Sequence, residues 1–302
     1  MSGQNVFAGA FVDRWGHRRE DPDWLRNAIQ SDDSCFVAVW GDKCLASGEP
    51  FHTILLDRHD VSEHLSEQEI IFLGKFRDRP AFAFGIDGAT ETPFQDIGEY
   101  HDLRYLGSVL PADEANLVAH ARALVLWHRM QKYCGRCGSP SKAESGGNSR
   151  ICGDTECGTV LFPRVDPAII VLVRKDNKCL LGRQPSWPES RYSTIAGFVE
   201  PGESLEDAVR REVKEEANIL VENIAYHSSQ PWPFPSSLML GFTAEALSGD
   251  ILLNDGELED AQWFSRKQLR SGFPKLPYRL SIARRLVDDW LLSDSDGISQ
   301  AR

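Results

Sequence analysis

The segment from Gly197 to Ile219, GFVEPGESLEDAVRREVKEEANI, constrains the fold more than any other part of the chain. Ser204 is placed to cap the start of a helix, with Asp207 three residues later as its reciprocal partner. The apolar residues that follow recur at helical spacing and define the side facing a core: Leu205, Ala208, Val209 and Val213. The segment therefore predicts an amphipathic helix that begins after Ser204.

Glutamates occupy positions on this helix where apolar side chains would be expected. At about 3.6 residues per turn, Glu212, Glu215 and Glu216 share one face, and Glu212 and Glu216 lie almost in line with Leu205. Carboxylates near a core repel one another and lose hydration, so they persist only beside divalent cations or strong donors. Hard cations such as Mg²⁺ suit that role. The pattern predicts a metal-binding helix directed at phosphate; the alternative is a solvated helix with pairs such as Arg211 with Glu215.

The wider pattern favours the metal-binding interpretation. With Gly197 and Glu203, the segment gives G-x5-E-x7-R-E-V-x-E-E-x-N-I, which resembles the signature of the Nudix hydrolases at every defined position except one. The family has Gly where this chain has Asn218. Because Asn tolerates the left-handed conformation that ends many helices, we expect this difference to cost little.

Composition sets broad limits on the protein. A chain of 302 residues is long enough for about two domains. No run of about 18 apolar residues is present, and the N-terminal MSGQNVFAGAFVDRWGHRRE lacks the basic start and apolar core of a secretory signal. We therefore expect a cytoplasmic protein without a membrane segment. The net charge of −12 argues against a broad basic surface for nucleic acid, so a phosphate-bearing substrate must be attracted locally.

Cysteine spacing predicts a zinc ribbon. The pattern C-x2-C-x14-C-x4-C is formed by Cys134, Cys137, Cys152 and Cys157. Four thiolates close the coordination sphere, so this zinc should be structural. The alternatives are disulfides or unrelated thiols, and an odd total of seven cysteines fits a disulfide scaffold poorly. Apolar surroundings favour a core position for Cys35, Cys44 and Cys179.

Short apolar runs before about residue 110, such as Cys35 to Trp40, indicate a β-rich domain, and a helical pattern follows from Ala112 to Met130. Strands on both sides of the glutamate helix indicate an α/β sandwich. The predicted fold class is therefore α/β, with a Nudix α/β/α sandwich preceded by a β-rich domain and a small zinc ribbon. We place the β-rich domain and its linking helix at 1–128, the ribbon at 129–163, the sandwich at 164–293 and a disordered tail at 294–302.

A proline-rich motif, SQPWPFPSS, follows at Ser229 to Ser237. Pro231, Pro233 and Pro235 remove backbone donors, so we expect a stiff extended loop and no ordinary central strand. Exposed Trp232 and Phe234 would then help to shape a nucleotide pocket. The alternatives are a ligand for another domain or a loop made rigid for stability.

Together, these motifs resemble the NADH pyrophosphatase family of Nudix hydrolases. The resemblance is strong from Cys134 onward and weaker upstream, where Ile71 to Gly74, Asp102 to Arg104 and Ala121 to Leu124 are similar to the family. It implies cleavage of the pyrophosphate of NAD(H) into AMP and nicotinamide mononucleotide, and removal of NAD caps from RNA. It also implies a homodimer.

The resemblance implies site residues by position. The catalytic metal ligands would be Glu212, Glu215, Glu216, the carbonyl of Ala196, and Glu257, with Asp255 or Glu259 as alternatives to Glu257. Phe198 would stack on the base, as would Phe162 from the partner subunit, where the family often has Tyr. The remaining substrate positions would be Gln230, Pro231, Trp232, Pro233, Phe234, Pro235, Ser236, Ser237 and Ala283.

The expected mechanism is attack of water on a pyrophosphate phosphorus, assisted by two or three Mg²⁺ or Mn²⁺ ions. Glu215 or Glu216 would accept the proton of the water, and the sequence does not choose between them. Arg211 and Glu203 would lock the preceding loop onto the helix. Two other hypotheses remain at this point: an enzyme whose main substrate is another dinucleotide or NAD-capped RNA, and a catalytically silent nucleotide sensor.

Overall fold

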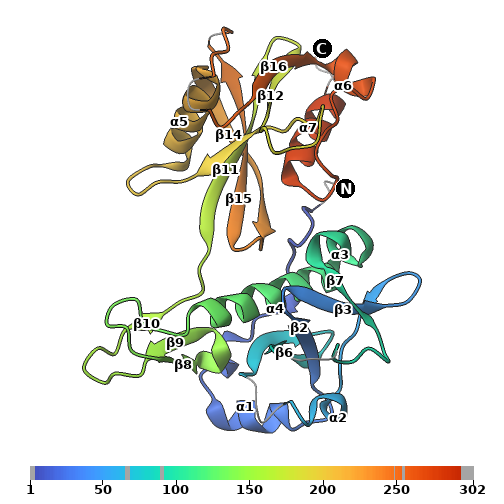
Figure 1. Cartoon of the computed structure of the whole chain (residues 1–302), viewed down its shortest axis with the longest axis vertical. Helices are drawn as coiled ribbons and strands as arrows, with labels where there is room; N and C mark the ends of the chain where they lie inside the picture. Colours follow the sequence, from blue (N-terminus) through green and yellow to red (C-terminus); the bar gives the residue numbers. More distant parts are fainter. Residues whose placement is uncertain (1–3, 65–68, 89–91, 248, 254–255, 294–302) are drawn as a thin grey trace, which may run out of the picture. The chain divides into compact units, whose positions relative to one another are not determined.

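The computed structural model describes residues 4–64, 69–88, 92–247, 249–253 and 256–293. They form two compact units, coloured along the sequence in Figure 1. The N-terminal unit comprises residues 6–165 and 233–236, and the C-terminal unit comprises the described residues of 1–5, 166–232 and 237–302. The predicted ribbon thus belongs to the same unit as the β-rich domain, and the predicted disordered tail at 294–302 lies outside the described residues.

The N-terminal unit is built on a mixed sheet with the strand order β1-β5-β6-β2-β3-β4, in which β7 also pairs with β3. Its core is rich in aromatic side chains, including Phe36, Phe72, Phe82 and Phe84. The strands are β1 (Val12–Asp13), β2 (Cys35–Trp40), β3 (Lys43–Ser47), β4 (His52–Thr53), β5 (Ile71–Phe76), β6 (Arg79–Ile86) and β7 (Glu99–Asp102). The α-helices are α1 (Pro22–Ile29), α2 (Arg58–Val61), α3 (Leu103–Val109) and α4 (Ala112–Met130).

Helix α4 has the predicted bounds, and it is a core element of the N-terminal unit. It packs against β2, β5 and β6 and buries side chains around most of its circumference, including polar Asn116 and Arg122. The residues after it form the ribbon, a small antiparallel sheet in the order β10-β9-β8, with β8 at Ser141–Glu144, β9 at Ser149–Cys152 and β10 at Val160–Leu161.

The C-terminal unit is a mixed sheet in the order β14-β15-β11-β12-β16, with β13 paired to β11. The central pair, β11 and β15, is parallel, whereas the other pairings are antiparallel. The strands are β11 (Asp166–Lys175), β12 (Lys178–Arg183), β13 (Ile195–Phe198), β14 (Val221–Trp232), β15 (Ser237–Ala246) and β16 (Asp260–Ser265), and the helices are α5 (Leu205–Ala217), α6 (Arg266–Arg270) and α7 (Ile282–Leu292).

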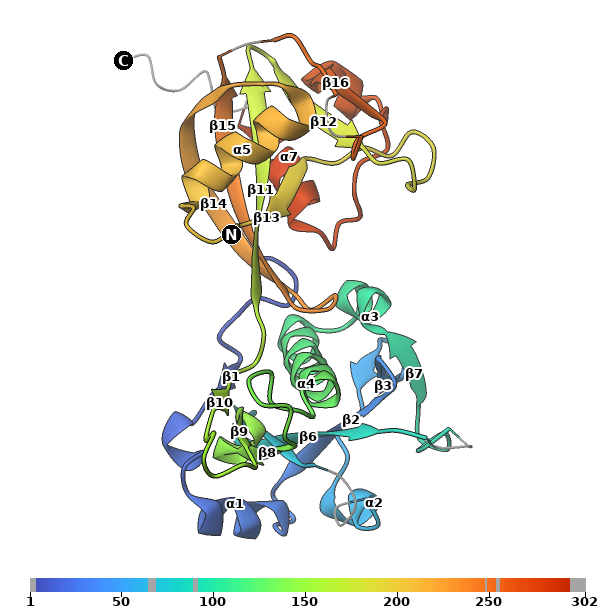
Figure 2. The ribbon, with the colours of Figure 1, turned by 60° about the vertical axis from the view of Figure 1, so that its left-hand side comes forward.

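Strand β11 explains why this unit is a sandwich. Its alternate residues Ile169 and Val171 face the core formed with α5, whereas Ile170 and Leu172 face the core formed with α7. Figure 2 shows these helices with the sheet between them. A strand buried on both faces has a continuous apolar sequence, as this one does. The predicted α/β/α sandwich is confirmed.

The prediction for the proline-rich motif was partly wrong. Ser229 to Trp232 form the end of strand β14, Ser237 begins β15, and only Pro233–Ser236 connect them. The prolines argued only against a central strand, which has a neighbouring strand on each side. Strand β14 lies at the edge of the sheet, so the missing amide hydrogen of Pro231 deprives no second neighbouring strand of a donor.

No helix among the described residues is long and apolar enough to cross a membrane.

Helix α5 has the caps that its sequence predicts. Ser204 and Asp207 form a reciprocal capping box, and Asn218 adopts the left-handed conformation at φ 59° and ψ 25°. The amide of Asn218 donates to the carbonyls of Lys214 and Val213, which closes the last turn. The residue that departs from the Nudix signature therefore keeps the backbone conformation that favours Gly.

We predict that Asn218→Ala destabilises the C-terminal unit by about 1 kcal/mol, because the β-carbon of Ala is disfavoured in the left-handed region. Asn218→Gly should be at least as stable as the wild type. Urea unfolding of the purified proteins measures both effects. Equal stability of the Ala and Gly variants would contradict the importance of this conformation.

Candidate active site

The central feature of the site is the contact between Glu212 of α5 and Gly197 of β13. A β-carbon at Gly197 would lie 1.9 Å from Oε1 and 2.0 Å from Cδ of Glu212. Gly197 lies in strand β13 without a positive φ and pairs with Ile169 of β11. It is required for space, because only a residue without a side chain lets the carboxylate lie against the strand.

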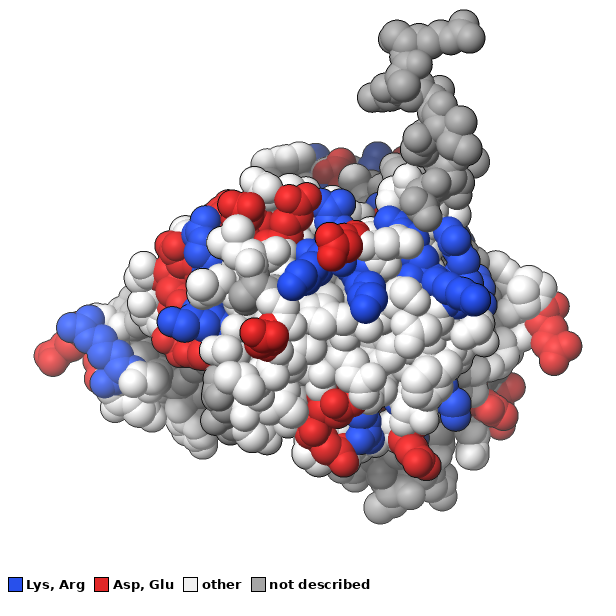
Figure 3. All heavy atoms as spheres, turned by 90° about the horizontal axis from the view of Figure 1, so that it is seen from above, with Lys and Arg blue, Asp and Glu red and all other residues white. Residues whose placement is uncertain are grey.

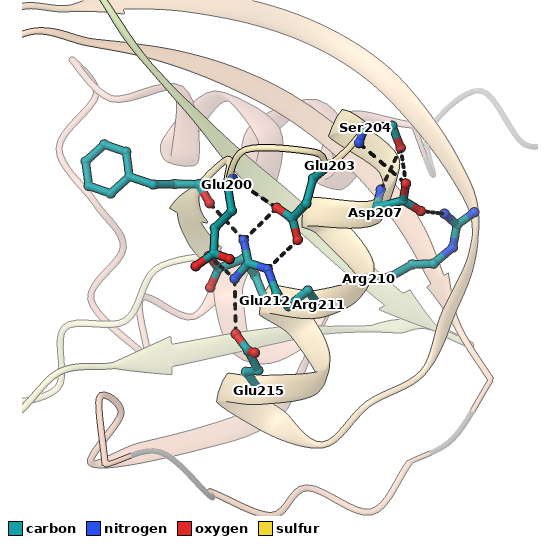
Figure 4. A network of polar contacts seen from close by, with 9 residues as sticks. Glu200, Glu203, Ser204, Asp207, Arg210, Arg211, Glu212 and Glu215 are labelled. Carbon is teal, nitrogen blue, oxygen red and sulfur yellow. Dashed lines mark hydrogen bonds and ion pairs between the residues drawn. The ribbon is translucent and has the colours of Figure 1, made fainter.

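A single guanidinium connects the loop to the glutamate helix (Figure 4). Arg211 Nε and Nη2 donate to the two oxygens of Glu203 at 2.6 and 2.9 Å, and Nη2 also donates to the carbonyl of Phe198 at 2.9 Å. Its Nη1 donates to Glu212 at 2.8 Å and to Glu215 at 3.1 Å. The predicted pairing of Arg211 with Glu203 is confirmed, and the structure adds Phe198 to it.

The surroundings change the acidity of these groups in opposite directions. Burial raises the pKa of Glu212, and the charges of Glu215 and Glu257 act in the same direction, whereas Arg211 opposes them. Hydrogen bonds from Arg211 and from the backbone amide of Glu200 lower the pKa of Glu203 to about 2. Glu212 is thus a desolvated carboxylate that additional positive charge would stabilise, which fits a cation site.

The other predicted acidic ligands have different environments. Glu216 is buried one helical turn after Glu212, whereas the side chain of Glu215 is 54% exposed. Glu257 lies on an exposed loop, close enough for its charge to affect Glu212. Of the alternatives, Glu259 is paired with Arg183, and Asp255 lies outside the described residues.

The two candidate stacking rings are exposed. Phe198 follows Gly197 at the end of β13 and is 60% exposed, and Phe162 of the N-terminal unit is 72% exposed. Ala196 is half-buried and pairs with Ile170 of β11. The structure thus places Ala196, Phe198 and Glu212 around Gly197, and it leaves both rings available to a ligand.

Most of the remaining predicted substrate positions are buried or half-buried. Gln230 is completely buried: its Nε2 donates to the carbonyl of Leu280, and its Oε1 accepts from the amide of Ile282, each at 2.8 Å. Ala283 is also buried. Trp232 and Phe234 are half-buried, not exposed as predicted, because the chain forms a packed hairpin here. Half-buried or exposed surface remains at Pro231, Pro235, Ser236 and Ser237, whereas Pro233 is buried.

The cysteines of the ribbon form a site suited to a tetrahedral metal ion. The sulfur atoms of Cys134, Cys137, Cys152 and Cys157 all lie within 4.8 Å of one another. A zinc ion with Zn–S bonds of about 2.3 Å would space its sulfurs by about 3.8 Å. The Cys137–Cys152 and Cys134–Cys157 sulfur distances are 3.4 and 3.9 Å. The seven cysteines, all in the described part of the chain, are free thiols, and Cys35, Cys44 and Cys179 are buried as predicted.

Comparison with known proteins decides the family. A model described as "NUDIX domain" matches residues 163–290, and one described as "NADH pyrophosphatase-like rudimentary NUDIX domain" matches residues 33–127. NAD-capped RNA hydrolase NudC of Deinococcus radiodurans is 43% identical over 75% of this chain and 79% of that protein. The chain belongs to the NADH pyrophosphatase family of Nudix hydrolases.

Another relative extends the match across the chain. NAD-capped RNA hydrolase NUDT12 of Homo sapiens is 33% identical over 95% of this chain and 73% of that protein. The family resemblance that the sequence motifs carry is confirmed, including its weaker N-terminal part. What the motifs could not reveal is the match of residues 33–127 to a rudimentary NUDIX model, because the sequence of this segment lacks the R-E-x-x-E-E pattern.

The low pKa of Glu203 leads to a prediction. Because its folded pKa of about 2 lies below the ordinary 4.5, its contribution to stability is present above pH 4.5 and is lost as the pH falls through about 2. Carboxyl ¹³C NMR should show Glu203 still ionised at pH 4. In Arg211→Met, its pKa should move back towards 4.5. Titration of the wild-type residue near 4.5 would contradict the loop–helix link.

Proposed function

We propose that this Nudix hydrolase cleaves the pyrophosphate bond of NAD(H), giving AMP and nicotinamide mononucleotide, and that it also removes NAD caps from RNA. The buried carboxylate of Glu212, seated against Gly197 beside Glu215 and Glu216, is the observation that carries the proposal. The names of the relatives, NAD-capped RNA hydrolases at 33–43% identity, support the substrate class.

The proposed catalytic cations are two or three Mg²⁺ or Mn²⁺ ions. Their ligands would be the carboxylates of Glu212, Glu215, Glu216 and Glu257 and the carbonyl of Ala196. When bound, such ions neutralise the diphosphate and make water a better nucleophile. The raised pKa of Glu212 supports this assignment, since a bound cation would compensate its burial.

The remaining roles in the proposed reaction would belong to side chains of the protein. Glu215 or Glu216 would accept the proton of the attacking water. Arg211 is already bonded to Glu203, Glu212 and Glu215, and it would hold these carboxylates in position. Phe198 would stack on one face of a base, and Phe162 of the partner subunit in a homodimer would stack on the other.

The net charge of −12 means that a phosphate-bearing substrate must be attracted locally. The face of the molecule in Figure 3 carries basic side chains beside acidic ones. The ribbon would hold one structural zinc ion. A cytoplasmic location is proposed from the sequence alone.

The first test is incubation of the purified protein with NADH and Mg²⁺ or Mn²⁺, with chromatography of the products. Equimolar AMP and reduced nicotinamide mononucleotide are expected. Glu216→Gln should lose at least about 2 kcal/mol of transition-state stabilisation, because it removes a charged group from an electrostatic site. Glu206→Gln, the same change at an exposed position of α5, is the matched control and should remain active.

Full activity of Glu216→Gln would overturn its catalytic assignment. Tight NADH binding by the wild type without hydrolysis would instead indicate a nucleotide sensor. Hydrolysis of NAD-capped RNA without hydrolysis of NADH would limit the substrate to capped RNA ends.

A second prediction concerns zinc. Native mass spectrometry should find one zinc ion per chain, and Cys137→Ser should lose it, because the site then retains only three of its four thiolates. Cys44→Ala changes a buried cysteine outside the ribbon and should keep the metal. A wild-type protein that folds without zinc would contradict the structural role.

A further inference from the structure

The N-terminal unit contains family-like motifs that the proposed chemistry does not use. Asp102-Leu103-Arg104 begins helix α3, and Ala121-Arg122-Ala123-Leu124 lies in helix α4. The arginines of both motifs contact Pro233–Ser236, the connection between β14 and β15, which is part of the same unit. This connection is the tip of the proline-rich substrate motif.

Arg122 is a buried cation directed at this connection. It is 5% exposed, its Nη1 donates to the carbonyl of Pro233, and its Nε donates to the carbonyl of Asp42 at 2.6 Å. Its Nη2 lies 3.3 Å from the carboxylate of Asp42. Burying a guanidinium costs free energy unless its N–H groups donate hydrogen bonds. Moving the connection away from Arg122 would therefore leave a buried donor unpaired and would be unfavourable.

The ring of Phe234 provides a second attachment. The guanidinium carbons of Arg104 and Arg122 lie 4.0 and 5.2 Å from the ring centre, and the ring of Phe7 lies 6.1 Å away. Arg104 is fixed by the cap of α3, where its amide donates to Asp102 at 2.7 Å. Cations at these distances are attracted to the ring face.

The prolines explain why such an attachment is needed. Pro233 and Pro235 have no amide hydrogen, so this turn has fewer backbone hydrogen bonds with which to hold itself. Trp232 and Ser237, which flank it, form the last pair of the β14–β15 ladder. Side chains from α3 and α4 contribute contacts to this turn through the carbonyl of Pro233 and the ring of Phe234.

We propose that Arg104 and Arg122 are positioning residues for the substrate motif. By holding the tip through Pro233 and Phe234, they fix the strand ends that carry Trp232 and Ser237. The anchoring stands on the contacts above, whereas its effect on the substrate rests on the proposed function.

The test compares Phe234→Leu, Arg104→Met and Arg122→Met with the wild type. Arg104 and Phe234 are partly exposed, so their variants should fold even if the buried Arg122→Met does not. Hydrogen exchange of the amides of residues 236–240 should become at least about tenfold faster, which corresponds to ~1.4 kcal/mol. For NADH, KM should rise about tenfold while kcat changes less than about twofold, as expected when binding alone is weakened.

Arg129→Met is the matched control. Arg129 lies on the same helix and donates to the carbonyls of Gly41, Val39 and Ile86, whereas Arg122 donates to Asp42 and to Pro233 of the connection. This variant should lower Tm without changing KM or the exchange of the hairpin. A Phe234→Leu variant with unchanged exchange would overturn the anchoring, and faster exchange with unchanged KM would overturn the positioning role. A wild type that fails to hydrolyse NADH would refute the proposed function, and the exchange comparison would still decide the anchoring.

Discussion

The contact between the Glu212 carboxylate and Gly197 is the constraint on which the site depends. It requires a glycine on the strand, because a β-carbon at this position would overlap the carboxylate. The approach desolvates a carboxylate, which raises its pKa, and Arg211 offsets only part of that cost. Since an acidic group in this state is stabilised by further positive charge, the packing of α5 on β13 and the proposed binding of cations both involve this contact.

The fold supplies the rigidity that this contact needs. Strand β11 is buried on both faces, with α5 on one side and α7 on the other, and it pairs directly with β13. Arg211 then ties the loop after β13 to α5 through Glu203 and the Phe198 carbonyl. A displacement of α5 would therefore break core packing and an ion-pair network together, which favours one arrangement of the carboxylates.

The sequence predicted the elements whose signals are local. The capping box at Ser204, the left-handed Asn218 and the bounds of α4 depend on neighbouring residues, and each was predicted correctly. The hairpin at Ser229 to Ser237 was predicted as a loop, because only the sheet order reveals that Pro231 lies on an edge strand. Two sets of contacts were not predictable, since they join residues that are not neighbours in the sequence. These are the contact of Gly197 with Glu212 and the contacts of Phe234 with Arg104 and Arg122.

The dependence of cation binding on the contact of Glu212 with Gly197 is tested by Mn²⁺ binding to the wild type and to Gly197→Ala, measured by electron paramagnetic resonance of the free ion. The added methyl group would meet the flexible end of Glu212, so it should displace the carboxylate and leave α5 folded. Mn²⁺ binding by the variant should be at least about tenfold weaker, or ~1.4 kcal/mol, with unchanged circular dichroism. Equal Mn²⁺ affinity in the two proteins would contradict this dependence.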